Sequence, residues 1–396
     1  MIDLFEKCYK PGIADEAKAL GIYPYFHALE SKQDTEVIME GKRRIMLGSN
    51  NYLGLTTDPE VIAAGIEAFR TLGSGCSGSR FLNGTLKLHL ELEAELAKFL
   101  RKEAVMTFST GFQSNLGIIS AVVGKNDYVI MDRENHASLY DGCRLSYGTM
   151  LRFRHNDMAD LEEKLKHVPE TAGCLIVTDG VFSMGGDIAN LPEICSLARR
   201  YGARVMVDDA HGLGVLGEGG RGTASYYGLE NEVDIYMGTF SKSLASLGGY
   251  MAAEAKVVDY VKHCSRPFIF SASITPASCA SALAALHILE TRPELVTKLQ
   301  DNALYMRGLL REKNIKMRPS NGERVPIIPI YTYEPIETLT IAKELYDAGV
   351  YVNSSLPPAA APHECLLRTS LMASHTRALI EEAVGIIADV LRRHEL

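Results

Sequence analysis

The sequence predicts an α/β fold, in which a mostly parallel central sheet is covered by helices and joined to a smaller C-terminal α+β domain. The chain has 396 residues, and chains longer than about 250–300 residues usually divide into more than one domain. From residue 58 to about residue 266, short apolar runs rich in β-branched residues alternate with helical patterns. Strands that are buried on both faces and linked by helices are typical of a parallel sheet.

The N-terminal segment, residues 1–50, begins with an amphipathic stretch and continues into a strand pair. The two strands are expected at residues 35–39 and 44–47. The intervening Glu40-Gly41-Lys42 suits a hairpin turn, which predicts that the two strands pair with each other.

The large domain is expected over residues 51–290. Its strands are expected at residues 105–108, 128–131, 174–178, 204–207, 234–237 and 248–253, with helices between them such as 137–146 and 191–201. A long helix is expected at residues 275–289, and Thr291-Arg292-Pro293 interrupts the pattern. This interruption places the domain boundary near residue 290.

The small domain is expected over residues 291–396. The helical pattern resumes after the interruption and runs to residue 310. Strands are then expected at residues 326–331, 350–352 and 366–370, and helices at residues 337–348 and 376–393. This mixture of strands and helices predicts an α+β unit.

Composition excludes several classes of protein. The formal net charge is -8, which excludes a chain that is basic throughout and binds nucleic acid in that way. No apolar stretch is long enough for a transmembrane helix, and the first residues lack the apolar core of a secretory signal. None of the eight cysteines forms a C-x-x-C pair, as expected of core residues in a reducing compartment. We therefore expect a cytoplasmic enzyme, for which peripheral contact with a membrane surface stays open.

A lysine in a loop of small residues is the first candidate for chemistry. Lys242 follows the predicted strand at 234–237 and is flanked by Thr239, Ser241 and Ser243. Burial lowers the pKa of a lysine and leaves neutral amine, the form that reacts with an aldehyde. The flanking hydroxyls are candidates for binding a phosphate. The alternative is an ordinary solvated lysine.

Asp208 and His211 follow the predicted strand at 204–207, at the end where ligands bind in open α/β sheets. A carboxylate there can pair with a protonated pyridine nitrogen. A helix cap is the alternative. Too few spaced ligands surround these residues for a metal site, and we expect none.

Two further turns come after predicted strands. Gly111 opens a helix after the strand at 105–108, and backbone N–H groups at such a helix start can bind a phosphate. An ordinary capped turn fits equally well. His136, after the strand at 128–131, is positioned to stack on a flat ring or to act as a helix cap.

Two glycine patterns match G-x-G-x-x-G, at residues 73–78 and 212–217. A dinucleotide fingerprint must follow a strand and open a helix. The first pattern follows a helical stretch, and the second continues into further glycines. We expect neither to bind a dinucleotide.

Taken together and in order, these motifs resemble the α-oxoamine synthases, a family of fold-type I enzymes that use pyridoxal 5′-phosphate (PLP). The resemblance covers nearly the whole chain. It is carried by residues 49–55 (Ser-Asn-Asn-Tyr-Leu-Gly-Leu), 135–138 (Asn-His-Ala-Ser), 179–184 (Asp-Gly-Val-Phe-Ser-Met), 208–211 (Asp-Asp-Ala-His) and 238–242 (Gly-Thr-Phe-Ser-Lys).

The resemblance implies roles around the cofactor ring. Lys242 would hold the cofactor and move the α-proton of the substrate, and Asp208 would pair with the pyridine nitrogen. His211 and Ser183 would bind the phenolic oxygen of the ring, and His136 would stack on the ring.

It also implies the phosphate and substrate contacts. These residues are Gly111, Phe112 and Thr239 at the phosphate, Ser271 and Ser273 reaching it from the other subunit of a homodimer, Arg368 at the substrate carboxylate, and Asn50 and His136 in the substrate pocket. The expected partners are an amino acid, an acyl-CoA and a second copy of the chain.

Three stretches resemble the bacterial serine palmitoyltransferase branch of this family: residues 23–26, residues 75–85, and Ser241 directly before Lys242. That branch condenses L-serine with palmitoyl-CoA to give 3-ketosphinganine, CoA and CO₂, the first step of sphingolipid synthesis. Glycine C-acetyltransferases and 8-amino-7-oxononanoate synthases usually carry Gly in place of Ser241 and remain the alternatives. A fold-type I aminotransferase would share the lysine and the aspartate, whereas a non-catalytic subunit is expected to lack the lysine.

Overall fold

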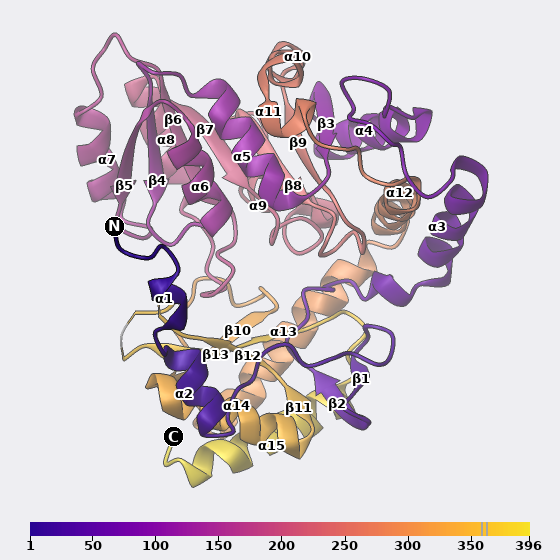
Figure 1. Cartoon of the computed structure of the whole chain (residues 1–396), viewed down its shortest axis with the longest axis vertical. Coiled ribbons are helices and arrows are strands. Elements are labelled where there is room, and N and C mark those ends of the chain that lie inside the picture. Colours follow the sequence, from indigo (N-terminus) through magenta and orange to yellow (C-terminus); the bar gives the residue numbers. More distant parts are fainter. Residues whose placement is uncertain (358, 362) are drawn as a thin grey trace.

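The structure is a computed structural model that describes residues 1–357, 359–361 and 363–396. It confirms the predicted fold class, because a large α/β domain is followed by a smaller domain of helices and short strands (Figure 1). Within the described residues, no helix combines the length and the apolar character needed to cross a bilayer.

The large domain is built on a seven-stranded sheet. Its strands are β3 (Ala104–Phe108), β4 (Tyr128–Asp132), β5 (Thr149–Phe153), β6 (Cys174–Asp179), β7 (Arg204–Asp208), β8 (Ile235–Thr239) and β9 (Gly249–Ala253), in the spatial order β3-β9-β8-β7-β6-β4-β5. The five strands from β8 to β5 are mutually parallel, and β9 is antiparallel to both of its neighbours.

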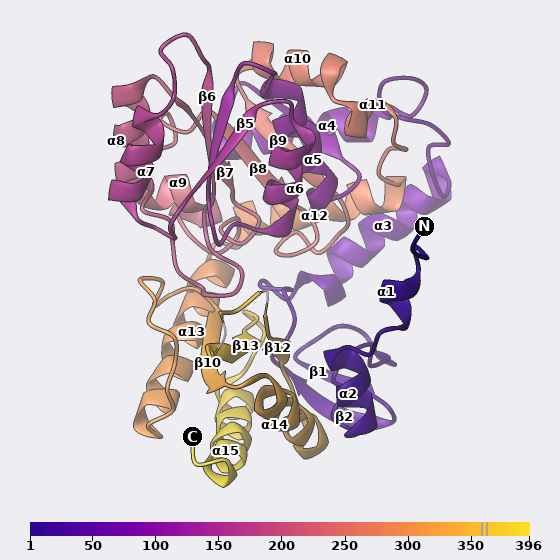
Figure 2. The same ribbon diagram turned by 60° about the vertical axis from the view of Figure 1, so that its left-hand side comes forward.

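Helices cover both faces of this sheet. They are α3 (Pro59–Leu72), α4 (Lys87–Leu100), α5 (Gly111–Val122), α6 (Ala137–Leu145), α7 (Met158–Lys166), α8 (Leu191–Tyr201), α9 (Thr223–Tyr227), α10 (Ala255–Cys264), α11 (Arg266–Ile269) and α12 (Pro276–Thr291), with single 3₁₀ turns at Leu55–Thr57 and Glu218–Gly220. In Figure 2, α7 and α8 lie on one side of the strands and α5 and α6 on the other.

Alternation along the strands explains these two layers. On β4, Ile130 belongs to one apolar cluster, whereas Val129 and Met131 belong to the second. Successive side chains of a strand point to opposite faces, so a run of apolar residues needs a cover on both. The first cluster continues into the small domain through residues such as Leu299 of α13 (Glu294–Glu312) and Ile387 of α15 (Arg377–Arg393), and one core therefore spans both domains.

The small domain follows α12 directly. It comprises α13 (Glu294–Glu312), β10 (Ile327–Tyr333), α14 (Pro335–Ala348), β11 (Val350–Tyr351), β12 (Asn353–Ser355), β13 (Cys365–Ser370) and α15 (Arg377–Arg393). Strand β13 lies between β10 and β12 and is antiparallel to both.

The N-terminal segment packs with the small domain. It comprises α1 (Glu6–Tyr9), α2 (Ile13–Ala19), β1 (Glu36–Met39) and β2 (Lys42–Met46). Strands β1 and β2 form the expected hairpin, and β2 also pairs in parallel with β11. Strand β2 comes before the large domain in the sequence, yet it pairs with a strand of the small domain. Both views show the N-terminal segment beside that domain (Figures 1 and 2).

Two strands escaped the sequence analysis. Strand β5 is the edge of the large sheet, and its exposed Arg152 breaks the apolar run that marks the inner strands. Strand β12 has only three residues, Asn-Ser-Ser, and none of them is apolar. Both strands form because a neighbouring strand offers them hydrogen bonds, which is a tertiary effect.

Candidate active site

The candidate residues gather at the carboxyl ends of the parallel strands. Asp179 ends β6 and pairs in register with Asp208, which ends β7. Thr239 ends β8, and Lys242 follows in the next loop. The sequence places these residues tens of positions apart, and the parallel register brings them to one edge of the sheet.

Asp208 is held by a chain of polar side chains. The Nδ2 atom of Asn115, on α5, donates to Oδ2 of Asp208 at 2.7 Å and to Oγ of Ser138 at 2.8 Å. The Ser138 hydroxyl lies 2.7 Å from Nδ1 of His136, and Oδ1 of Asp208 accepts from the backbone N–H of Ala210 at 3.0 Å. Asn115 thereby connects Asp208 to His136.

His136 caps the start of α6 and points into the site. Its backbone N–H donates to Oδ2 of Asp179 at 2.9 Å, and the ring of Phe112 meets its ring edge-on with the centroids 6.3 Å apart. Burial, and secondarily the charge of Lys242, lower the pKa of His136, although Asp208 opposes the shift. Burial, followed by the nearby charge of Asp208, raises the pKa of Asp179 well above its usual value.

Asp209 has a structural role. Its carboxylate accepts from the backbone N–H of Thr223 at 2.7 Å and from the Thr223 hydroxyl at 2.6 Å. A Cβ atom added at Gly212 would lie 1.9 Å from Oδ1 of Asp209, and one added at Gly222 would lie 1.8 Å from Oδ2. Gly212, which belongs to a pattern that resembles a dinucleotide motif, and Gly222, which lies outside it, thus both make room for a buried carboxylate.

Lys242 lies partly open to solvent but mostly among protein groups. Desolvation lowers the pKa of its amine to about 8, although the carboxylates of Asp208 and Asp179 oppose the shift, and the positive charge of Arg368 adds to the lowering. A lysine of this kind holds an appreciable neutral fraction near neutral pH, as nucleophilic attack on an aldehyde requires.

The predicted phosphate contacts come together at the start of α5. A Cβ atom added at Gly111 would lie 2.8 Å from Oγ1 of Thr239, so only glycine fits there. The hydroxyls of Thr239 and Ser241 are 2.9 Å apart. The hydroxyl of Ser243 instead donates to the buried carbonyl of Leu213 at 2.7 Å, which removes it from the candidate phosphate contacts.

Arg368, on β13, is buried and has only neutral partners. Its Nε donates to the carbonyl of Ser183 at 2.5 Å, and one Nη donates to Oδ1 of Asn50 at 2.9 Å and more weakly to the Tyr52 hydroxyl at 3.4 Å. Among the described residues, no carboxylate lies within 4.0 Å of this guanidinium. A buried cation without a counter-ion is costly, which favours an anionic ligand here.

Tyr52 joins Arg368 to His211, a link that the sequence analysis missed. The Tyr52 hydroxyl lies 2.6 Å from Nδ1 of His211. Burial, then the charges of Lys242 and Arg368, lower the pKa of His211 well below its usual value. Since Arg368 donates to the oxygen of Tyr52, the Tyr52 proton is directed to Nδ1, which leaves the proton of the neutral ring on Nε2.

Ser271 and Ser273 lie apart from this group within the chain. The hydroxyl of Ser273 donates to the carbonyl of Gly84 at 2.7 Å and to that of Gly78 at 3.2 Å. Neither serine has a hydrogen bond to the other candidate residues among those that the structure describes.

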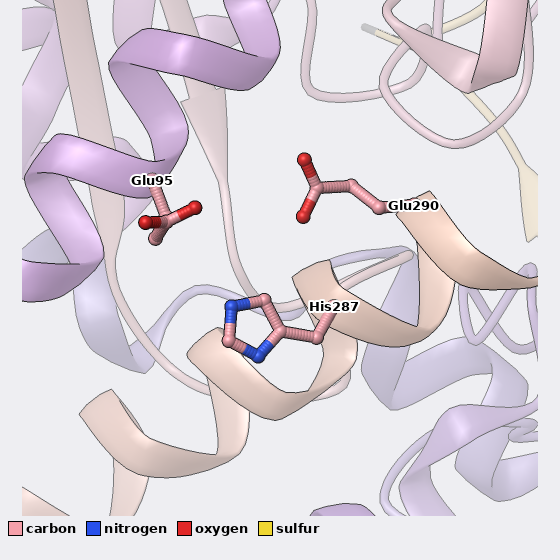
Figure 3. A group of neighbouring side chains, drawn as sticks. All are labelled: Glu95, His287 and Glu290. Carbon is pink, nitrogen blue, oxygen red and sulfur yellow. The ribbon is translucent and has the colours of Figure 1, made fainter.

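A separate surface group could be mistaken for a metal centre. Glu95 of α4 and His287 and Glu290 of α12 have ligand atoms within 4.8 Å of one another (Figure 3). His287 and Glu290 are exposed, and none of the three belongs to the strand-end group described above. Exposed carboxylates often cluster in this way, and we assign this group no part in the chemistry.

Comparison with known proteins gives consistent matches over the whole chain. The model of the family "Aminotransferase class I and II" matches residues 42–387. Serine palmitoyltransferase of Sphingobacterium spiritivorum is 50% identical over 393 residues, which cover 99% of this chain and 98% of the relative. An 8-amino-7-oxononanoate synthase of Thermoanaerobacter pseudethanolicus is 41% identical over 371 residues, 93% of each chain.

A solved structure superimposes just as completely. The high-resolution structure of serine palmitoyltransferase (SPT) with a PLP internal aldimine has a TM-score of 0.95 and 38% identity, and the match covers 99% of each chain.

The lowered pKa of Lys242 gives a pH prediction for the ligand-free protein. Only the neutral amine condenses with an aldehyde, so labelling of Lys242 by a small aldehyde and borohydride should rise with pH, reach half of its maximum near pH 8 and level off about one unit higher. Peptide mapping at several pH values measures this, with the exposed Lys256 as comparison. Equal labelling of the two lysines at pH 7.5 would contradict the prediction.

Proposed function

The chain belongs to the aminotransferase class I and II family and, within it, to the α-oxoamine synthases, and we propose that it is a PLP-dependent serine palmitoyltransferase. It condenses L-serine with a long-chain acyl-CoA, palmitoyl-CoA, to give 3-ketosphinganine, CoA and CO₂. This condensation, which forms 3-ketosphinganine, is the first step of sphingolipid synthesis.

One observation carries this proposal. Lys242 has a pKa of about 8, and the charge of the nearby Arg368 contributes to this lowering. Arg368 is buried and, among the described residues, has no carboxylate partner. An α-amino acid carries an amine and a carboxylate on one carbon. The two side chains therefore suit the two ends of such a substrate, with the cofactor attached at Lys242.

The residues present fit the cofactor. Asp208, fixed by Asn115 and by the N–H of Ala210, suits a protonated pyridine nitrogen. His136 supplies a flat ring for stacking, and Nε2 of His211 together with Ser183 suits the phenolic oxygen.

The phosphate contacts fit as well. The N–H groups of Gly111 and Phe112 begin α5, where the helix dipole favours an anion, and the Thr239 hydroxyl lies beside them. Asn50, bonded to Arg368, completes the substrate pocket with His136.

When bound, PLP supplies an electron sink for charge that develops at the α-carbon of the amino acid. The protein's own groups do the rest. Arg368 orients the substrate by its carboxylate, and Lys242, as a neutral amine, takes the α-proton. Asp208 stays bonded to Asn115 and offers its charge to the ring nitrogen.

In this proposal, a second copy of the chain completes the site. Phe81 (45% exposed), Leu82 (75%) and Phe270 (79%) display apolar surface, and an isolated bridge joins their two segments. Ser271 follows Phe270 directly, and Ser273 comes after one intervening residue. A homodimer would cover these apolar side chains and bring the two serines to the phosphate of the partner's site.

We place the enzyme in the cytoplasm, because all eight cysteines are free thiols and four of them are buried. Its partners are then L-serine and an acyl-CoA, and no nucleic acid is proposed, because the net charge of -8 does not favour binding to a polyanion. Contact with a membrane surface stays open for the delivery of the acyl donor.

The test of the cofactor site is chemical mapping. Borohydride reduction of the holoenzyme should leave the pyridoxyl group on Lys242, and Lys242→Ala should retain no reducible cofactor. A thiol assay with serine and palmitoyl-CoA should detect released CoA, which an aminotransferase would not produce. Label on any other lysine would overturn the assignment.

Arg368→Ala should raise KM for the amino acid on the order of 100-fold, because charge-assisted hydrogen bonds to the carboxylate are lost. KM for the acyl-CoA should change little, since the acyl donor does not carry that carboxylate. Steady-state kinetics with each substrate varied in turn measures this. Arg199→Ala, at an exposed salt bridge, is the matched control. Equal effects of Arg368→Ala on both substrates would indicate a structural role.

L-Serine should be preferred over glycine and L-alanine by about 100-fold or more in kcat/KM with one long-chain acyl-CoA. A pocket that hydrogen-bonds a hydroxyl rejects analogues that leave its polar groups unpaired. His136 is the candidate partner for that hydroxyl. Preference for alanine or glycine would keep the family and reject the serine branch, as in an 8-amino-7-oxononanoate synthase or a glycine C-acetyltransferase.

A further inference from the structure

A short hairpin carries the carbonyl that binds Arg368. An isolated bridge pairs Val181 with Ile188, and the N–H of Phe182 donates to the carbonyl of Asp187 at 2.9 Å. We call residues 181–188 the 181–188 hairpin. Because the Ser183 carbonyl lies on it and accepts from Nε of Arg368 at 2.5 Å, the position of this hairpin sets the orientation of the guanidinium.

The hairpin is fixed on one side by a histidine between two carboxylates. Nε2 of His155 lies 2.5 Å from Oδ2 of Asp187, and Nδ1 lies 3.0 Å from Oδ1 of Asp132, at the end of β4. Carboxylates accept hydrogen bonds, so both ring nitrogens must carry protons and the ring is an imidazolium. Burial alone would lower the pKa of His155, but the bonds to Asp132 and Asp187 outweigh it and raise the pKa to about 10.

The carboxylate of Asp132 is held in place by backbone hydrogen bonds. Asp132 is 1% exposed, and its two oxygens accept from the backbone N–H groups of Glu134 and Asn156, both at 2.8 Å. The remaining charged groups that face His155 are Glu134, at 3.9 Å, and Arg318, which donates to Glu134 at 2.9 Å. Arg318 is thus already paired.

Asp187 therefore depends on His155. Oδ1 of Asp187 is buried and has no hydrogen-bond partner among the described residues, so the bond to His155 is the one hydrogen bond that its carboxylate makes there, while Arg318 acts on its charge from nearby without bonding to it. A Cβ atom added at Gly185 would lie 2.1 Å from this Oδ1, so the turn is closed tightly around it.

The small domain fixes the other side of the hairpin. Oγ of Ser320 donates to the carbonyl of Gly186 at 3.0 Å. The Asn321 amide accepts from the N–H of Ile188 at 2.7 Å and donates to its carbonyl at 3.0 Å. The hairpin is thus held between His155 of the large domain and residues 320–321 of the small domain, next to Arg368.

We propose that His155 is a positioning residue for the substrate carboxylate, because it clamps Asp187 and thereby holds the 181–188 hairpin where its Ser183 carbonyl orients Arg368. The inference rests on the proposed function, in which Arg368 binds that carboxylate. Loss of the imidazolium leaves Asp132 and Asp187 as facing buried carboxylates, and their repulsion displaces the hairpin.

The experiment compares two ligands of the holoenzyme, L-serine and ethanolamine, which has the same amine and hydroxyl but no carboxylate. Binding is followed by the change in cofactor absorbance. In the unmodified enzyme, serine should bind much more tightly than ethanolamine. If the two bind alike, the proposed role of Arg368 fails before His155 is tested.

In His155→Gln, the Kd for serine should rise about tenfold, corresponding to one well-placed hydrogen bond, and the Kd for ethanolamine should stay within about twofold. His167→Gln, at the histidine that ends α7 and whose ring hydrogen-bonds, among the described residues, only to the Glu163 carbonyl, is the matched control and should leave both values unchanged. Equal weakening of both ligands in His155→Gln would overturn the proposal.

A double-mutant cycle separates positioning from general damage. If His155 acts through Arg368, then His155→Gln should add nothing to the loss of serine binding in Arg368→Ala. Additive losses would mean that His155 acts elsewhere. If His155→Gln does not fold, Asp187→Asn breaks the same contact from the hairpin side, and the same comparison of serine with ethanolamine decides the question.

Discussion

The uncompensated charge of Arg368 is the constraint on which the rest of the site depends. Arg368 is 4% exposed, yet among the described residues its guanidinium is bonded only to the Ser183 carbonyl, the Asn50 amide and the Tyr52 hydroxyl. These neutral acceptors offset part of the free-energy cost of burying the guanidinium, but they do not neutralise its positive charge. The charge therefore remains available to bind an anion. Ser183 comes from the loop after β6, whereas Asn50 and Tyr52 come from the junction of the N-terminal segment and the large domain. A single binding group therefore requires three distant segments to be in place.

The other half of the site is a row of buried carboxylates along one edge of the sheet. Asp179, Asp208 and Asp209 are all at most 5% exposed, and each has its own donor: the His136 N–H, the Asn115 amide and Thr223 respectively. The field of Asp208 and Asp179 also limits how far burial can lower the pKa of Lys242, which settles at about 8 rather than lower. The same carboxylates thus hold the geometry and tune the lysine.

Whether a feature of the fold or site can be predicted from the sequence depends on how far apart in the chain its interacting residues lie. The inner strands, such as β4 and β6, begin and end within a residue or so of the predicted bounds, because continuous apolar runs mark strands that are covered on both faces. The strand-end residues Asp208, His136 and Lys242 were predicted for a similar reason, since the ends of parallel strands meet. Asn115 and His155 were missed because their partners lie 93 and 32 residues away and no local pattern records them. The reason for one glycine of residues 212–217 also escaped the sequence analysis, because Gly212 makes room for the side chain of Asp209 and no glycine pattern records that contact.

In the proposed function, the two ends of the substrate would be held by different domains. Lys242 belongs to a loop of the large sheet, whereas Arg368 belongs to β13 of the small domain. Their separation is therefore set by contacts between domains, which include the shared apolar core and the 181–188 hairpin, and not by any motif that contains both. A change at such a contact can alter how an amino acid is held without touching any residue that binds it. Because those contacts join residues from all parts of the chain, the reaction class can be inferred from strand-end motifs, whereas the preference for one amino acid depends on packing that only the folded molecule displays.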